Sequence, residues 1–477
     1  MKKRQILFLL LFLFPLCLSV RAADEARCVN NACDMRIYGE RADTLLDGNL
    51  RSHSKLHKGT ELTVNSSELI GGLYLEFSAA PGEYTLRAGD QTRKCGQSGF
   101  LHQYIGELNC YSLTLRFQGE GILANVYVLS PGDKPEWVQD WEPCWDRTDV
   151  LLLPTHSDDD ALFFGGIIPW CLDRGARVQV AYLISHSTEP YRCNELLNAL
   201  WVSGLRNYPV LGIYEDLGPD ESMEKQIELY AKDKVPYDDM LLRQLRLYRQ
   251  FRPQVVICHD SKGEYGHGAH KLYYQLAADA MEMAGNGSVD ASSAARFGVW
   301  TPSKLYVHLL RERPVVIDLD EPLRSFNYRT GYELAQKAFA CHESQYDFFS
   351  WYFWGAPTAA QLQQYSAREY GLYYSAVGDD VSGRSFFDNL TLCDSPGETD
   401  AAPAEAEAPE TLPEEAPEAA PAAEEESSHS AATLVNPRLG EIRAEQRRLV
   451  CGICALLAVV AALLITLHKL KIKEREQ

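Results

Sequence analysis

Residues 156–160 concentrate side chains that can bind a metal ion and move protons. The segment reads His-Ser-Asp-Asp-Asp and follows the apolar run at residues 150–153. Ser157 and one or two of the acids would suit the start of a helix, where they cap free N–H groups and face the positive end of the helix dipole. Three acids behind a histidine would repel one another, however, unless a cation lay among them. We interpret the segment as half of a metal site, with helix capping as the alternative.

A second group of histidines follows another apolar run, at residues 254–258. His267 and His270 lie three positions apart at the start of an expected helix. In open α/β sheets, ligands collect at the carboxyl ends of strands, where two such runs would meet. The combined ligand set would be His156, Asp159 and His270. Zinc accepts two histidines and a carboxylate and keeps one position open for water, while Asp158 would be free to act as general base.

These motifs resemble those of the zinc-dependent PIG-L/LmbE-like de-N-acetylases. That family usually carries a His-Pro-Asp-Asp-Glu block, matched here by residues 156–160, and a Tyr-Gly-His-Pro-Asp-His segment, matched by residues 265–270. An intervening Arg-x-x-Glu is matched by residues 192–195, and a late His-x-Ser-Gln by residues 342–345. The motifs occur in the family's order, and the resemblance covers roughly residues 149–355.

The resemblance implies a role for each matched side chain. The zinc ligands would be His156, Asp159 and His270. Asp158 would activate the water at the metal, and His267 and Tyr265 would stabilise the oxyanion or protonate the amine leaving group. Arg192 would contact the substrate. The physical logic agrees, because zinc lowers the pKa of its water to about 7 and preorganised donors stabilise the charge on the carbonyl oxygen.

The sequence departs from the family's pattern at three positions. Ser157 replaces the usual proline, and Asp160 replaces a glutamate, so that the carboxylate is kept on a shorter side chain. Ala269 replaces an acid that, in relatives, supports the neighbouring His267 from behind. We expect Asp260 or Glu264, from the same loop, to supply that support.

Strands alternate with helices in the expected catalytic domain, residues 141–393. Buried strands are expected at 150–153, 177–184, 210–214 and 254–258, and helices at 194–205, within 221–251 and at 327–345. This alternation predicts an α/β domain with a parallel, Rossmann-like sheet. No G-x-G-x-x-G follows the first strand, so we expect no nucleotide cofactor. His342, in the last helix, would lie behind the metal ligands.

Short alternating runs characterise residues 24–140. They include residues 73–77, 84–88, 112–117 and 124–130. Turn residues separate these runs, which predicts an all-β sandwich. Residues 45–49 weakly resemble the start of galactose-binding-like discoidin domains, and a carbohydrate-binding module is one interpretation. A structural companion with no ligand is the alternative. The tryptophan-bearing connector 136–144 is expected to pack the two domains together.

Both ends of the chain carry targeting features. Residues 1–23 have a basic start and an apolar core, which is typical of a secretory signal. Residues 394–433 are rich in Ala, Pro and Glu and form an expected acidic linker, which holds most of the net charge of -20. The charge makes nucleic acid an improbable partner. Residues 449–467 are apolar and long enough for a transmembrane helix, followed by a cytoplasmic tail at 468–477. We therefore expect an exported, single-pass membrane protein.

Cysteines are frequent in the expected exported part, where disulfides are allowed. Cys95 with Cys110 and Cys144 with Cys393 are the candidate pairs.

Two classes of function fit these features. The favoured one is a cell-surface zinc hydrolase that removes an N-acetyl group from an amino sugar or glycoconjugate of the GlcNAc type. The alternative is a non-catalytic glycan-binding protein on the same fold, and an amidase for another N-acyl group is a third interpretation. Retention of Asp158 favours an enzyme, because a binding protein could lose the general base freely, whereas Ala269 points the other way.

Overall fold

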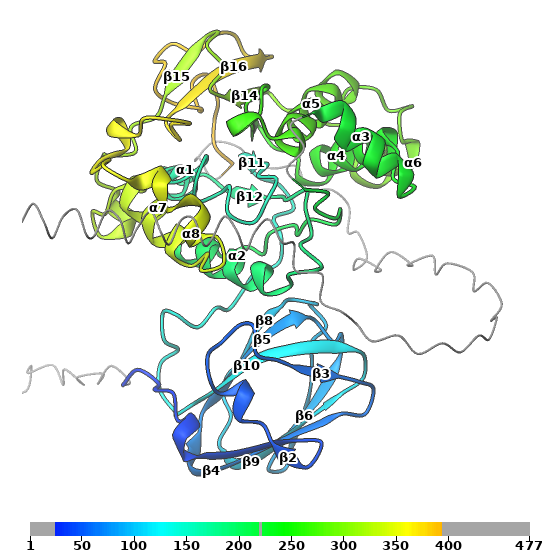
Figure 1. Ribbon diagram of the computed structural model, residues 1–477, viewed down its shortest axis with the longest axis vertical. Coiled ribbons are helices and arrows are strands. Elements are labelled where there is room, and N and C mark those ends of the chain that lie inside the picture. Colours follow the sequence, from blue (N-terminus) through cyan, green and yellow to red (C-terminus); the bar gives the residue numbers. More distant parts are fainter. Residues whose placement is uncertain (1–23, 219–221, 394–477) are drawn as a thin grey trace, which may run out of the picture. The chain divides into compact units, whose positions relative to one another are not determined.

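The computed structural model describes residues 24–218 and 222–393, which contain two sheets of antiparallel strands followed by a mixed sheet with helices on both faces (Figure 1). The predicted signal (1–23), linker (394–433), transmembrane helix (449–467) and tail (468–477) lie outside the described residues. Within the described ranges, no helix combines the length and apolar character needed to cross a membrane.

The N-terminal part is all β. One sheet has the order β2-β1-β4-β9-β6-β7 and the other β3-β10-β5-β8. The strands are β1 (Cys33–Ile37), β2 (Glu40–Arg41), β3 (Ser54–Leu56), β4 (Glu61–Ile70), β5 (Gly72–Ala79), β6 (Tyr84–Ala88), β7 (Gln91–Cys95), β8 (His102–Ile105), β9 (Cys110–Phe117) and β10 (Gly121–Leu129). In β6, Tyr84, Leu86 and Ala88 are buried while Arg87 is exposed, which is the alternation of a strand with one face on the core. The prediction of an all-β part agrees with this arrangement, and the discoidin resemblance stays a prediction.

The third sheet has the order β12-β11-β13-β14-β16-β15. Its strands are β11 (Val150–Leu152), β12 (Val178–Val180), β13 (Val255–Cys258), β14 (Lys304–His308), β15 (Pro314–Val316) and β16 (Glu369–Ser375). The first four in this order are parallel, as predicted, but β16 runs antiparallel to both β14 and β15. The sheet is therefore mixed rather than purely parallel.

Helices cover both faces of this sheet. They are α1 (Ile167–Asp173), α2 (Tyr191–Val202), α3 (Met223–Lys232), α4 (Tyr237–Phe251), α5 (Gly268–Met283), α6 (Ala291–Phe297), α7 (Gly331–Ala340) and α8 (Tyr346–Phe349). Val150 and Leu152 pack in one apolar cluster with α1, α2 and α7, whereas Leu151 and Leu153 pack in another with α4 and α5. Burial on both faces explains why the strand reads as a continuous apolar run.

The boundaries of α2 differ from the prediction of residues 194–205. The helix starts at Tyr191, directly after Pro190, whose ring suits a helix start because it has no N–H to satisfy. It ends at Val202, and Gly204 adopts a positive φ of 90° that breaks the helix. Arg192 therefore lies inside the first turn of α2 rather than before it.

The helix expected at 327–345 is shorter than predicted. Asn327 and Tyr328 have positive φ, and α7 starts only after Thr330, which forms a capping box with Glu333. The helix ends at Ala340, so His342 lies in the turn beyond it.

The expected strand at 210–214 is likewise reduced. Val210 and Tyr214 form only isolated bridges to Ala181 and Ile184, since Gly212 interrupts the run.

Neither candidate disulfide is present among the described residues, where these cysteines are free. Cys95 pairs with Tyr84 on β6, and β6 separates β7 from β9, which carries Cys110. The thiol of Cys144 contacts the carbonyl oxygen of Tyr208 instead of Cys393. The predictions of both pairs are wrong for this structure.

The capping box of α7 offers a test of the local fold. We expect Thr330→Ala to lower the free energy of unfolding by about 1 kcal/mol, because the N–H of Glu333 loses its acceptor. Urea unfolding followed by circular dichroism measures the change. The exposed Thr44 supplies the matched control Thr44→Ala, and an equal loss in both variants would contradict the capping role.

Candidate metal centre

Residues 155–160 turn back on themselves directly after β11. The carboxylate oxygen Oδ2 of Asp159 accepts the backbone N–H groups of Thr155 (3.1 Å) and His156 (2.7 Å), which fixes the turn. Asp158, Asp159 and Asp160 are each at most 3% exposed. Burying three carboxylates in one turn is costly unless cationic partners or a metal ion lie among them.

The second segment runs from the end of β13 to α5. His267 caps α5, with its Nδ1 accepting the N–H of Ala269 at 3.3 Å, and His270 follows in the first turn. The structure brings these histidines to the turn after β11, because β11 and β13 are parallel neighbours whose carboxyl ends lie side by side.

Three ligand atoms from the two segments form a nearly equilateral triangle. Nδ1 of His156 lies 3.2 Å from Nε2 of His270 and 3.4 Å from Oδ2 of Asp159, and the third edge measures 3.5 Å. Ligands bound at about 2.0–2.1 Å around a tetrahedral ion are about 3.3–3.4 Å apart. The predicted set of His156, Asp159 and His270 therefore has the spacing that one such ion requires.

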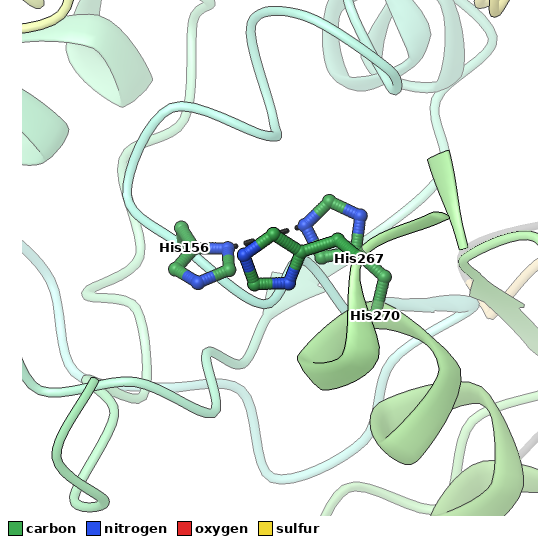
Figure 2. A group of neighbouring side chains, drawn as sticks. All are labelled: His156, His267 and His270. Carbon is green, nitrogen blue, oxygen red and sulfur yellow. Dashed lines mark hydrogen bonds between the residues drawn. The ribbon is translucent and has the colours of Figure 1, made fainter. Parts of the chain in front are cut away.

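Two further histidines approach these atoms. His267 groups with His156 and His270, and Figure 2 shows the three imidazole rings converging from the turn after β11 and the start of α5. His259 groups with Asp159 and His270. The N–H of Thr155 is shared between Nε2 of His259 (3.0 Å) and Oδ2 of Asp159 (3.1 Å). The choice of His156 over His259 as the metal ligand rests on the match of residues 156–160 to the family's first motif.

Glu264 is a fully buried carboxylate behind the histidines. It accepts hydrogen bonds from Nδ1 of His259 and His270, both at 2.8 Å, and from Nδ1 of His308 at 2.6 Å. Burial alone would raise the pKa of Glu264, but the surrounding histidines hold it well below its usual range. The bond to Nδ1 of His270 leaves Nε2 of that ring free for a metal.

The carboxylates expected to support His267 have other partners in the structure. Glu264 bonds to His270 rather than to His267. Among the described residues, Asp260 contacts this group through its backbone N–H, which donates to Glu264 at 3.1 Å. The carboxylate of Asp260 accepts the N–H of Lys262 in its own loop.

Asp158 and Arg192 form a buried pair. The guanidinium of Arg192 lies 3.3 Å from Oδ1 of Asp158. Burial raises the pKa of Asp158, while Arg192 acts in the opposite direction. Burial also acts to raise the pKa of Asp159, but His270 and His259 outweigh it and hold that pKa well below its usual range. Of these two neighbouring acids, Asp158 is therefore the better proton acceptor.

Tyr265 lies at the outer side of the histidines. Its ring centroid is 5.4 Å from that of His267 and 5.5 Å from that of His270, and the residue is 37% exposed. Its φ of 46° is uncommon for a tyrosine and costs free energy that the surrounding packing must supply. This conformation keeps the phenol beside the two imidazoles.

Asp160 and His342 are buried polar residues near the same centre. Neither oxygen of Asp160 and neither ring nitrogen of His342 makes a hydrogen bond of ordinary geometry to the described residues, although Tyr182 is close enough to influence the pKa of Asp160. Burial raises the pKa of Asp160 well above its usual value and lowers that of His342 to about 3. Burial thus disfavours the charged form of both side chains beside the metal ligands.

The two remaining motifs contact each other. The carboxylate of Glu195 on α2 accepts the backbone N–H of Ser344 at 2.9 Å and its hydroxyl at 2.6 Å. This contact fixes the turn that carries His342 against the helix that carries Arg192.

Four residues of the centre were missed by the sequence analysis. They are His186, Asp216, His259 and His308. His259 follows β13 directly and His308 is the last residue of β14, so the rule that ligands gather at strand ends could have found both. Nε2 of His186 accepts the N–H of Ser157, and Asp216 lies 3.9 Å from Nε2 of His156, but both come from irregular segments without a sequence signal.

Comparisons with known proteins find similar sequences for part of this chain. Residues 151–281 match the family described as GlcNAc-PI de-N-acetylase, PIG-L. The 1D-myo-inositol 2-acetamido-2-deoxy-alpha-D-glucopyranoside deacetylase 1 of Catenulispora acidiphila is 26% identical over 180 residues, which cover 33% of this chain and 54% of the relative. The corresponding deacetylase of Streptomyces scabiei is 27% identical over 199 residues, covering 37% and 59%. The chain thus spans little more than half the length of these curated relatives.

A solved structure is also similar. The N,N'-diacetylchitobiose deacetylase from Pyrococcus horikoshii aligns with 48% of this chain and 83% of its own, with 17% identity and a TM-score of 0.32.

The carboxylate of Glu264 can be tested through metal affinity. We expect Glu264→Gln to weaken binding about 10- to 100-fold, because the ligand histidine loses the charged acceptor that orients it. Competition with a chromophoric chelator measures the affinity. Glu282, exposed on α5, supplies the control Glu282→Gln, and equal affinities in both variants would contradict this role.

The choice between His156 and His259 gives a second test. We expect His156→Ala to lose bound metal, whereas His259→Ala keeps about one ion per chain at saturating zinc. Elemental analysis after gel filtration measures the ratio, with circular dichroism as the check on folding. The reverse outcome would assign the ion to Asp159, His259 and His270.

Proposed function

We propose, from the premise that residues 151–281 form a PIG-L family domain, that this chain is a zinc-dependent N-deacetylase of N-acetylated amino sugars or glycoconjugates. The observation that carries the proposal is the triangle formed by His156, Asp159 and His270, with the buried carboxylate of Asp158 beside it. Metal-assisted amide hydrolysis requires a metal site with a general base beside it.

Zinc is the metal that this donor set fits best. Two imidazole nitrogens and one carboxylate are typical of catalytic zinc sites, whereas Mg²⁺ and Ca²⁺ prefer oxygen ligands. When bound, zinc would polarise the amide carbonyl and lower the pKa of water at the site.

The chain's own residues would then carry the proton transfers. Asp158, held by Arg192, would accept the proton of the attacking water. As the C–O bond forms, His267 and Tyr265 would donate to the oxygen that gains negative charge. Breaking the C–N bond releases acetate, and the protonated Asp158 would return its proton to the amine nitrogen.

The substrate class rests on the relatives. The similar proteins from Catenulispora acidiphila and Streptomyces scabiei are named as deacetylases of an inositol-linked acetamido-glucopyranoside. A GlcNAc-type acetamide in this chain's site is the corresponding proposal.

The cellular location of the protein is a separate proposal. The basic and apolar start at residues 1–23 and the apolar segment at 449–467 support an exported protein anchored by one transmembrane helix, with the catalytic domain outside the cytoplasm. Both segments lie outside the described residues.

Acetate release tests the activity. The full-length protein, supplied with zinc, would be incubated with a panel of N-acetylated amino sugars and glycans. We expect acetate from the parent protein and a loss of at least about 100-fold with Asp158→Asn, because the general base is removed. The exposed Asp90 supplies the control Asp90→Asn, which should keep full activity.

The negative outcomes separate the alternatives. Bound zinc without acetate release from any substrate would favour the glycan-binding protein. Release of a different carboxylic acid would favour an amidase for another acyl group.

A further inference from the structure

A cleft of about 830 Å³ is lined by residues of the β-sandwich, of α2 and of the turn after α7. Clefts of about 300–1,000 Å³ are typical of ligand sites. The cleft lies outside the group of metal ligands, and none of the proposed catalytic side chains lines it.

One wall is a stripe of α2. Tyr191, Glu195, Asn198 and Val202 recur at helical spacing and line the cleft. The hydroxyl of Tyr191 bonds to Glu189, and the guanidinium of Arg51 from the sandwich lies 4.9 Å from the centre of the Tyr191 ring. One face of the Tyr191 ring is therefore covered by Arg51, and the stripe lines the cleft with this aromatic ring, a carboxylate and an amide.

The opposite wall comes from the sandwich and the connector. Tyr127 and Trp137 lie with their ring centroids 5.2 Å apart, and Trp137 is 46% exposed. Residues 47–51 add a polar loop beside these rings. A pyranose ring has an apolar C–H face and hydroxyl groups around its edge, so flat aromatic rings with polar neighbours suit it.

The charged side chains that line the cleft restrict the class of ligand further. The lining carries the carboxylates Asp47, Glu76, Glu195 and Glu343 but a single guanidinium, Arg51. Glu76 is buried and accepts from Asn125 at 2.9 Å. This excess of acids disfavours anionic ligands and suits a neutral sugar chain, or one that gains ammonium groups when its acetyl groups are removed.

Helix α2 and the turn after α7 connect the cleft to the proposed reaction centre. Glu195 lines it while bonding to Ser344, and Arg192, one turn earlier on α2, bonds to Asp158. Cys341 lines it directly before His342.

The two walls are joined by buried hydrogen bonds. Asn194 of α2 bonds to His102 and Ser78 of the sandwich, each at 3.1 Å, and the N–H of Leu101 donates to the hydroxyl of Tyr208. Buried networks of this kind hold two surfaces in one arrangement.

We propose that this cleft binds the neutral N-acetylated oligosaccharide chain that carries the reacting sugar, with the exposed Trp137 as its main stacking surface and Tyr127 and Tyr191 as flanking contacts. The inference rests on the proposed function. It makes the enzyme selective for chains of several sugars over single sugars.

Calorimetric titration of the full-length Asp158→Asn protein tests the cleft without turnover. The probes are tetra-N-acetylchitotetraose as the neutral chain, its fully deacetylated form, and a hyaluronan tetrasaccharide as the anionic chain. We expect the neutral chain to bind and the anionic chain to bind at least about tenfold more weakly. Adding Trp137→Ala should weaken the neutral chain about tenfold, because a stacking surface is lost.

Two further variants complete the test. Tyr111, 58% exposed on β9 and absent from the cleft, supplies the aromatic control Tyr111→Ala, which should leave binding unchanged. Glu343→Gln, at an exposed position, should weaken the deacetylated chain about two- to fivefold and leave the neutral chain unchanged.

Each outcome supports or overturns the cleft proposal. No binding of the neutral chain, equal binding of the anionic chain, or equal weakening by Tyr111→Ala would overturn the cleft proposal. Acetate release from the parent at the same kcat/KM for single sugars and tetrasaccharides would also overturn it while leaving the deacetylase intact. Binding with these selectivities but without acetate release would uphold the cleft and overturn the deacetylase.

Discussion

The cost of burying carboxylates governs this site. Asp158, Asp159 and Glu264 are withdrawn from water, and each is compensated by cationic or N–H partners: Arg192 for the first, backbone N–H groups and imidazoles for the second, three imidazoles for the third. The same compensation orients the histidines, because a ring that donates through Nδ1 to Glu264 can offer only Nε2 to a metal. The hydrogen bonds that compensate the buried carboxylates are therefore the same ones that orient the metal ligands.

The mixed sheet makes this arrangement possible with short segments of chain. β11, β13 and β14 are parallel neighbours, so the turn after β11, the loop after β13 and the last residue of β14 all lie at one edge. Their apolar side chains are buried on both faces, which leaves the strand ends as the place where polar side chains can gather. Residues far apart in the sequence thereby meet at Glu264.

Much of the centre could be predicted from the sequence because it lies in two short segments with strong patterns, residues 156–160 and 265–270. His259 directly follows β13 and His308 ends β14, but a single histidine at the end of an apolar run is a weaker signal than a motif, so both were missed. The partner of Glu264 was misplaced, because the loop's path, with Tyr265 at positive φ, cannot be deduced from residue types. The helix before His342 was overextended for the same reason, since Asn327 and Tyr328 adopt left-handed conformations that only the structure reveals.

Helix α2 has three neighbours at once: through Arg192 it holds Asp158, through Glu195 it holds the turn of Ser344, and through Asn194 it holds the sandwich. Evolution can thus vary the two parts of the chain at different rates. Substitutions in the loops of the sandwich leave the metal ligands untouched, so the front part is free to diversify while the chemistry stays the same. Residues where the sandwich contacts α2 must stay complementary to each other, and covariation between Asn194 and its partners His102 and Ser78 is the expected trace of that coupling in the sequences of relatives.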